Sequence, residues 1–312
     1  MVIFDALQSV LSIIIIIGIG YILTWKGWFD EETGKLFTKV VVNVSLPALM
    51  LSNLMSTFDR KALLVAIGGV VIPFASMVIS FGIAVIVSHL LRIKEGRKGT
   101  FQTMFFVSNT IFMGMPVNTA LFGELSTSYV LLYYIANTTL FWTLGIYLIQ
   151  KDGGKRDGGL FSIQTVKCIF TPPLMGFLAA FVLIMLGIKM PRFVMDTAKF
   201  LGNMTTPLSL LFIGITFRSI SLKDIHFSKD MVAIMLGRFV ISPLVVIGLS
   251  NLMEAPWIMK AVFTIQAAMP IATQASIVSK AYDADYQYAT IMVTVTTTAT
   301  LIFIPIYRAL LG

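Results

Sequence analysis

Ten hydrophobic stretches, each about long enough to cross a lipid bilayer, follow one another along this chain of 312 residues. A membrane helix needs about 20 consecutive apolar residues, and hydrocarbon admits only helices and closed barrels as spanning structures. The stretches fall at 5–25, 36–57, 62–91, 100–122, 127–150, 162–187, 193–217, 230–253, 257–281 and 287–307. We therefore predict an all-α polytopic membrane protein with ten transmembrane helices.

Composition agrees with a membrane location. Hydrophobic residues make up 57% of the chain and charged residues 12%, whereas about 25% of residues are charged in soluble globular proteins. The net charge of +8 is scattered over short loops, so we expect a lipid bilayer and no nucleic acid as the partner. The first stretch carries Asp5 and lacks the basic start and small-residue cleavage site of a signal peptide, so we expect it to be the first span.

The two halves of the chain are predicted to be inverted copies of one another. A polar, glycine-rich linker at 151–160 separates a first repeat at 1–150 from a second at 161–312. Five spans per half is an odd number, so the two copies must insert with opposite orientations. The loops after spans one, three, five, seven and nine hold most of the Lys and Arg residues. This distribution predicts that those loops are cytoplasmic and that both termini are extracytoplasmic.

A motif of an amide, a hydroxyl and a proline occurs once in each half. Its residues are Asn43, Ser45 and Pro47 in the first half and Asn203, Thr205 and Pro207 in the second. Proline removes a backbone donor from a membrane helix, and nearby Asn, Ser and Thr side chains can satisfy the freed groups. We predict that the motifs bend scaffold helices, with direct contact to a substrate as the alternative.

Spans four and nine each carry a proline among polar residues. These are Asn109, Thr110, Gly114 and Pro116 in span four, and Gln266, Pro270, Thr273 and Gln274 in span nine. Broken helices at matching places in two halves point to a transporter's binding site. Each half-helix N-terminus offers free N–H groups and about half a positive charge. We predict an anion site between the breaks; ordinary proline kinks with amides bonded between helices are the alternative.

Ionisable groups are nearly absent from the spans. Every Asp and Glu lies at or beyond a span end, so no buried carboxylate is available to relay a proton. Arg238 lies inside span eight; we expect it to reach the cytoplasmic interface, with an inward-facing role as the alternative. Cys168 is the single cysteine, and His89 and His226 lack ligands at helical spacing, so we predict no metal and no cofactor. Catalytic motifs are also missing, so the chain is not expected to be an enzyme.

Several motifs together resemble the auxin efflux carrier family, which includes plant auxin exporters and bacterial permease-like proteins for malate or malonate. They are Trp25–Asp30, Asn43–Pro47, Asn109–Pro116, Arg238-Phe239, Gln266–Pro270 and Ser279–Tyr282. The resemblance covers essentially the full chain. The chain lacks the long cytoplasmic loop that follows span five in the plant proteins, so it is most similar to the short prokaryotic members.

The resemblance implies a fold similar to that of bile acid sodium symporters. Spans one, two, six and seven would form a scaffold, and spans three to five and eight to ten a transport domain. Spans four and nine would cross at Pro116 and Pro270. Asn109 matches the substrate-binding asparagine of the family's fourth span, and Asn137 a polar position of the fifth. We also expect a location in the bacterial inner membrane and a homodimer formed through the scaffold helices.

These expectations describe a carrier of small organic anions that works by elevator-type alternating access. Without a carboxylate to carry a proton, transport would move net charge, and an inside-negative potential would drive efflux. The alternative is proton- or sodium-coupled symport of dicarboxylates such as malate or malonate, with Thr110, Thr273 and Gln274 as cation ligands. An integral membrane enzyme would need titratable residues facing one cavity, which the sequence lacks.

Overall fold

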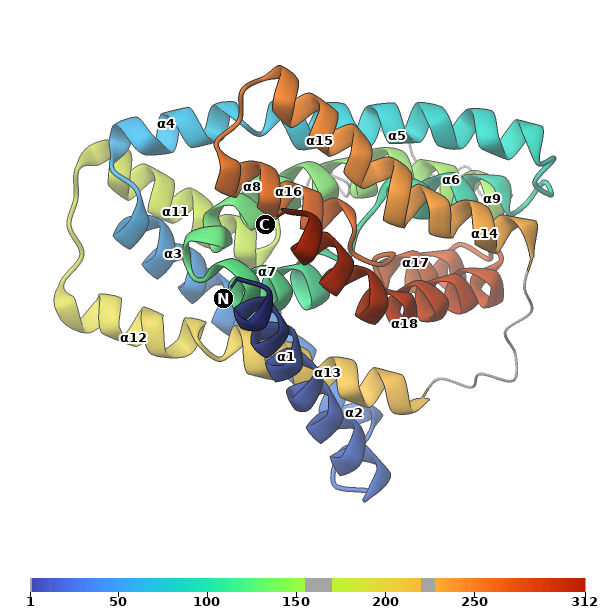
Figure 1. Ribbon diagram of the computed structural model, residues 1–312. Coiled ribbons are helices and arrows are strands. Elements are labelled where there is room, and N and C mark those ends of the chain that lie inside the picture. Colours follow the sequence, from blue (N-terminus) through green and yellow to red (C-terminus); the bar gives the residue numbers. More distant parts are fainter. Residues whose placement is uncertain (1, 155–169, 220–227, 312) are drawn as a thin grey trace.

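The computed structural model describes residues 2–154, 170–219 and 228–311 (Figure 1). Within these ranges the backbone is helical apart from turns, short connections and one isolated β-bridge. Most of the predicted linker, the start of predicted span six with Cys168, and His226 lie outside the described residues.

Each predicted span, in its described part, falls on one helix or on consecutive helices. The first half contains α1 (Val2–Trp25), α2 (Glu31–Val40), α3 (Leu46–Thr57), α4 (Arg60–Gly68), α5 (Val71–Leu90), α6 (Lys98–Phe106), α7 (Met115–Phe122), α8 (Leu125–Leu140) and α9 (Ile146–Asp152). The second contains α11 (Pro172–Leu186), α12 (Arg192–Gly202), α13 (Thr205–Ser219), α14 (Lys229–Leu236), α15 (Ser242–Leu252), α16 (Trp257–Ala267), α17 (Gln274–Ala281) and α18 (Tyr286–Leu311).

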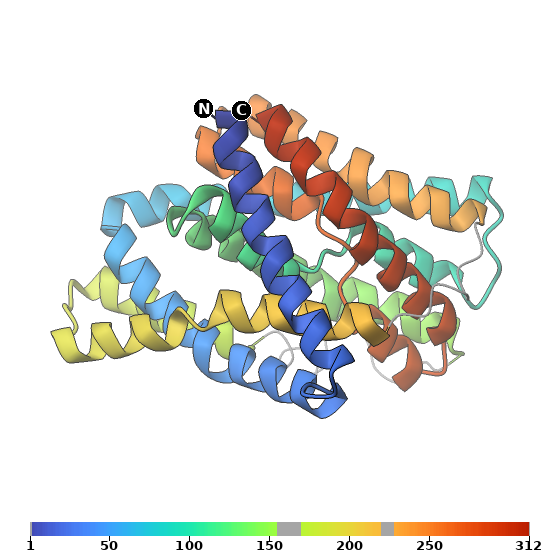
Figure 2. The same ribbon diagram turned by 60° about the horizontal axis from the view of Figure 1, so that its bottom comes forward.

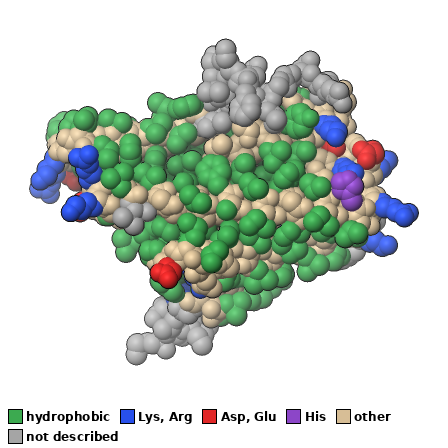
Figure 3. Space-filling view, turned by 90° about the horizontal axis from the view of Figure 1, so that it is seen from above, with side chains coloured by type: hydrophobic (Ala, Val, Ile, Leu, Met, Phe, Trp, Pro, Cys, Tyr) green, Lys and Arg blue, Asp and Glu red, His purple; other side chains and the backbone are tan. Residues whose placement is uncertain are grey.

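Several continuous helical runs are long and apolar enough to cross a membrane. The described ranges contain 6 of them, at Glu31–Thr57, Arg60–Leu90, Leu125–Asp152, Arg192–Arg218, Lys229–Leu252 and Tyr286–Leu311. Hydrophobic side chains cover a broad band of the surface in Figure 3, and charged side chains gather at its two ends. The prediction of an all-helical, polytopic membrane protein is therefore confirmed.

Several spans widen into a π-helical turn just before a proline. The turns η1 (Val41–Ser45), η2 (Thr110–Gly114) and η5 (Gly237–Ile241) precede Pro47, Pro116 and Pro243. Proline lacks the N–H that would close the preceding α-helical turn, and a π-turn accommodates the mismatch. A further π-turn, η3 (Phe141–Gly145), joins α8 to α9 without a proline. The distortion predicted around Pro47 is thus present, and its form is a widened turn.

The helices pack in two groups. In the first, α1 and α2 lie along α13, and α3 lies along α11 and α12. In the second, α5 packs on α6 and α15, α16 on α8 and α15, α6 on α9, and α17 on α18. Figures 1 and 2 show α12 and α13 passing along one side of the molecule, away from α5 and α15. The groups touch where α13 and α1 meet α7, where α1 meets α18 and where α3 meets α8.

Candidate functional site

Two interrupted helices meet at their interruptions. The chain leaves helix between α6 and η2, at 107–109, and again between α16 and α17, at 268–273. An antiparallel β-bridge pairs Ser108 with Ile271, and Asn109 N donates to Pro270 O at 2.8 Å. The first interruption therefore precedes the position expected at Pro116, which lies in the first turn of α7. At Pro116 itself the helix continues, because the π-turn η2 accommodates the missing N–H of the proline.

Side chains from neighbouring helices hold both interruptions open. Asn137 of α8 accepts from Ser108 N at 2.8 Å and donates to Ser108 O at 3.0 Å. Its amide supplies the partners that a continuous helix would have supplied. In the second half, Thr296 Oγ1 of α18 accepts from Ile271 N at 3.3 Å. In each half, a side chain of the last span thus forms a hydrogen bond with the backbone of the interrupted span.

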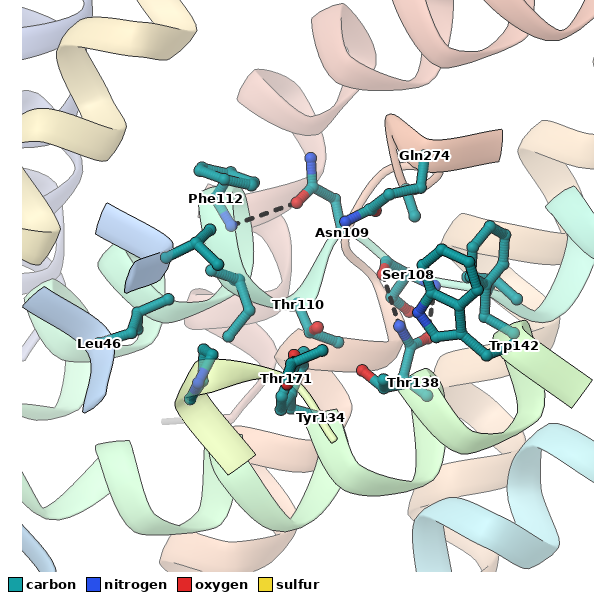
Figure 4. Close-up of a pocket in the computed structure, with 17 residues that line it drawn as sticks. Leu46, Ser108, Asn109, Thr110, Phe112, Tyr134, Thr138, Trp142, Thr171 and Gln274 are labelled. Carbon is teal, nitrogen blue, oxygen red and sulfur yellow. Dashed lines mark hydrogen bonds between the residues drawn. The ribbon is translucent and has the colours of Figure 1, made fainter. Parts of the chain in front are cut away.

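A cavity of about 110 Å³ lies beside the two interruptions (Figure 4). Its lining consists of Val42, Leu46, Val107, Ser108, Asn109, Thr110, Ile111, Phe112, Tyr134, Asn137, Thr138, Phe141, Trp142, Thr171, Pro173, Ala272 and Gln274. None of these side chains carries a negative charge. The lining includes the first residues of η2 and of α17, so the N-terminal ends of both second half-helices border the same small space.

Three predicted site residues retain unused hydrogen-bonding capacity in the cavity. Asn109 Oδ1 caps η2 by accepting from Phe112 N at 3.2 Å. In the described part of the chain, Asn109 Nδ2, Thr110 Oγ1 and the Gln274 amide form no hydrogen bond with protein. Asn109 is 6% exposed, so a ligand group in the cavity would find a nearly dry donor there.

Other predicted residues lie around the cavity without lining it. Gln266 is fully buried and donates to Thr110 O at 3.3 Å, while its Oε1 has no partner among the described residues. Gly114 packs against this amide: a Cβ at Gly114 would lie 2.2 Å from Gln266 Oε1. Pro270 contributes its carbonyl to Asn109, and Thr273 lines a neighbouring pocket.

The amide-hydroxyl-proline motifs do not contribute polar groups to the cavity. Val42, just before the first motif, and Leu46, within it, line the cavity with apolar side chains instead. Asn43 is exposed and donates to Lys39 O at 2.8 Å, while Ser45 is buried. The remaining motif residues, which also lie outside the lining, are Pro47, Asn203, Thr205 and Pro207.

A wider pocket of about 840 Å³ adjoins the cavity and shares Val42, Phe112 and Gln274 with it. Its charged lining residues are Glu31, Lys35, Lys39 and Arg218. Lys35 is well exposed and is paired with two carboxylates, Glu32 at 2.8 Å and Glu31 at 3.1 Å. Cations therefore outnumber carboxylates along this approach, and the local potential favours anions.

Most of the cavity face formed by α8 and η3 was not predicted from the sequence. Tyr134, Thr138 and Trp142 lie there beside Asn137, and the Tyr134 hydroxyl is 2.8 Å from Thr171 Oγ1 at the start of α11 (Figure 4). Positions three and four residues apart share one face of a helix. Tyr134, Thr138 and Trp142 follow one another at intervals of four, and Asn137 comes three residues after Tyr134, so this spacing was the available signal.

Arg238 does not reach the cytoplasmic interface, so that expectation is wrong. Its side chain is 0% exposed and donates to backbone carbonyls and to Ser108 at the two interruptions. The physical reason is that interrupted helices leave carbonyls without partners, and a guanidinium with five donors can satisfy several of them at once. Among the described residues, no three His, Cys, Asp or Glu side chains come together as a metal site.

Known transporters resemble this chain along nearly its whole length. The membrane transport protein family matches residues 5–308. An uncharacterized transporter of Methanothermobacter thermautotrophicus is 26% identical over 100% of this chain and 100% of its own. Another from Methanocaldococcus jannaschii is 23% identical over 96% of this chain and 97% of its own. The chain therefore belongs to the membrane transport protein family, which is the auxin efflux carrier family, and it is a membrane transporter.

Proposed function

We propose that this transporter carries small organic anions by elevator-type alternating access. The observation that carries the proposal is the cavity beside the paired interruptions. Two half-helix N-termini border it, Asn109, Thr110 and Gln274 offer polar groups that the described part of the protein does not use, and none of the described lining residues is a carboxylate. Half-helix N-termini in broken-helix transporters hold anionic substrate groups. The volume of about 110 Å³ is below the roughly 300–1,000 Å³ of pockets for drug-sized ligands, which favours a small substrate.

The proposed architecture has ten spans in two inverted repeats of five, at 1–150 and 161–312, with a fold similar to that of bile acid sodium symporters. Spans four and nine would cross at their interruptions. Two observations support it: the interruptions pair through Ser108 and Ile271, and each is held from its own half, by Asn137 in span five and Thr296 in span ten.

An elevator requires a substrate site carried mainly by one moving unit against a fixed wall. We assign α1, α2, α3, α11, α12 and α13 to the scaffold and the other described helices to the transport domain, because the helices pack in these two groups. Leu46, Thr171 and Pro173 form the scaffold's side of the cavity, and the transport helices supply its polar groups at the interruptions. Dimerisation through the scaffold is part of the same proposal.

We further propose electrogenic efflux across the prokaryotic cell membrane, with both termini extracytoplasmic. The cation-rich pocket beside the cavity contains Lys35, Lys39 and Arg218, all from predicted cytoplasmic ends of spans. It would gather anions from the cytoplasm. Proton- or sodium-coupled symport of a dicarboxylate remains the alternative, and the transport assay separates the two.

The test is uptake of isotopically labelled malonate, malate and indole-3-acetate into proteoliposomes under an imposed membrane potential. We expect at least one anion to accumulate when the interior is positive, in sodium-free buffer and without a pH gradient. Empty liposomes and the Asn109→Ala/Gln274→Ala double variant are the controls. Absence of uptake for every anion in the panel would contradict the proposal, and uptake only with a sodium or proton gradient would replace efflux by symport.

A further inference from the structure

Arg238 is surrounded by oxygen atoms from both interrupted helices. Its Nε donates to Met269 O at 3.1 Å, and its Nη2 donates to Met269 O and Ala267 O, each at 2.7 Å. Nη1 donates to Phe105 O at 3.4 Å, and Nη2 also donates to Ser108 Oγ. The guanidinium thus lies where the first half-helices, α6 and α16, come to an end.

The charge of Arg238 is balanced by helix ends and not by a carboxylate. Among the described residues, no Asp or Glu forms an ion pair with it. A helix C-terminus carries about half a negative charge in its unpaired carbonyls. The C-terminal ends of α6 and α16 together therefore offset about one positive charge, which makes full burial of the arginine tolerable.

The same oxygen atoms form a set suited to a mobile cation. Three carbonyls and one hydroxyl surround the guanidinium, and hard cations bind to oxygen ligands of these kinds. In broken-helix transporters, unwound carbonyls and half-helix C-terminal ends coordinate the coupling ion. We propose that Arg238 is a tethered cation that occupies such a position permanently, so that the anion cavity keeps its shape without bound sodium.

Ser108 connects this arginine to the cavity. Its hydroxyl accepts from Arg238, while its backbone N–H and carbonyl are held by Asn137. Ser108 and Asn137 both line the cavity. The neighbouring Gly237 permits the close approach, because a Cβ there would lie 2.4 Å from the Phe105 ring. Arg238 is thus a positioning residue, which acts on the substrate through the backbone of the first interruption.

The first test needs no substrate. Arg238→Ala would leave the carbonyls unpaired around an empty space, whereas Arg238→Met would fill that space with an apolar chain of similar length. For purified Arg238→Ala, we expect Tm to rise by about 3 °C or more when sodium chloride replaces choline chloride, or when millimolar guanidinium is added. Wild type and Arg238→Met should shift by less than about 1 °C. An Arg238→Ala protein that responds no more than Arg238→Met would overturn the proposal.

The second test measures transport and rests on the proposed function. Wild type should carry the labelled panel anion at rates equal within about twofold in sodium and choline buffers. Arg238→Ala should lose about tenfold or more in choline and regain several-fold of the loss in sodium. A wild type that needs sodium would refute the tethered cation. If wild type moves no anion, the proposed function fails, while the Tm comparison still decides the role of Arg238.

Arg238→Lys covers the case in which Arg238→Ala does not fold. Lysine keeps a tethered positive charge but provides fewer donors. We expect this variant to transport without sodium, at a reduced rate. Transport by Arg238→Lys that requires sodium, or its complete loss in a folded protein, would contradict the proposal.

Discussion

Asn109, Gln274 and Asn137 are all amides at the cavity, yet the protein uses them differently. Asn137 is occupied on both sides by the backbone of Ser108. Asn109 uses only its oxygen, as a cap, and Gln274 forms no hydrogen bond with the described part of the protein. Asn109 and Gln274 are therefore available to bind the anion, whereas Asn137 maintains the shape of the cavity. Substitutions should affect these two properties separately.

Asn109→Ala should weaken binding of the transported anion about fivefold or more, because Asn109 is nearly buried and a lost hydrogen bond in a dry site costs about 1–3 kcal/mol. Gln274→Ala should weaken it about twofold or more, because a hydrogen bond at an exposed side chain contributes only about 0.5–1.5 kcal/mol. Calorimetry on purified protein measures the affinity. Tm should change little for Gln274→Ala, because its side chain is exposed and forms no bond with the described protein. Unchanged affinity in both variants would place the anion elsewhere.

Asn137→Asp should mainly affect the fold. The substitution is nearly isosteric, but it places a carboxylate oxygen opposite Ser108 O in place of a donor. We expect destabilisation by more than about 2 kcal/mol, measured by thermal unfolding in detergent. Asn43→Asp is the matched control, because Asn43 is exposed and also bonds a backbone carbonyl. Equal effects of the two substitutions would show that the hydrogen bonds between Asn137 and Ser108 do not hold the first interruption in place.

At the scale of elements, the sequence predicted where the spans lie but not how the broken ones are built. Hydropathy and length located the helices, because both depend on local composition. Proline marked the right spans, yet the interruption precedes Pro116, since it depends on Asn137 of α8 and on Ile271 in the interruption of span nine. The burial of Arg238 was not predicted for the same reason: apart from the Ser108 hydroxyl, its acceptors are carbonyls, which every residue has and no sequence pattern reveals.

The contact between η2 and α16 offers a test at this scale. Gly114→Ala should destabilise the protein by about 1–3 kcal/mol, because its methyl group would press on the buried Gln266 amide. Adding Gln266→Ala should remove the clash, so the double variant should be more stable than the sum of the single changes predicts, by about 0.5 kcal/mol or more. Additive effects in thermal unfolding would show that the two residues do not press on each other.

For the whole molecule, an elevator mechanism requires that the two helix groups move relative to each other. Phe112 and Phe212 belong to different groups, and their ring centroids are 5.3 Å apart. Phe112→Cys with Phe212→Cys, in a Cys168→Ser background, should allow a short bifunctional maleimide to join the groups and stop transport of the labelled anion.

The matched control joins two helices of the proposed transport domain. Phe122 and Trp257 have ring centroids 5.9 Å apart and lie in α7 and α16. Joining cysteines at these two positions should leave at least about half of the transport rate, because an elevator moves its transport domain as one body. Transport that survives the Phe112–Phe212 cross-link would exclude movement between the groups.

The driving force of transport should be the membrane potential. Among the described residues, the cavity lining has no carboxylate to carry a compensating proton. Transport of a monoanion should therefore move net negative charge, and 100 mV then supplies about 2.3 kcal/mol per charge. We expect a substrate-induced current on a solid-supported membrane whose sign follows the anion and which persists without a sodium or proton gradient. The Asn109→Ala/Gln274→Ala variant should reduce this current. Electrically silent transport that collapses when the pH gradient is dissipated would identify proton symport instead, because a co-transported proton cancels the charge of the anion.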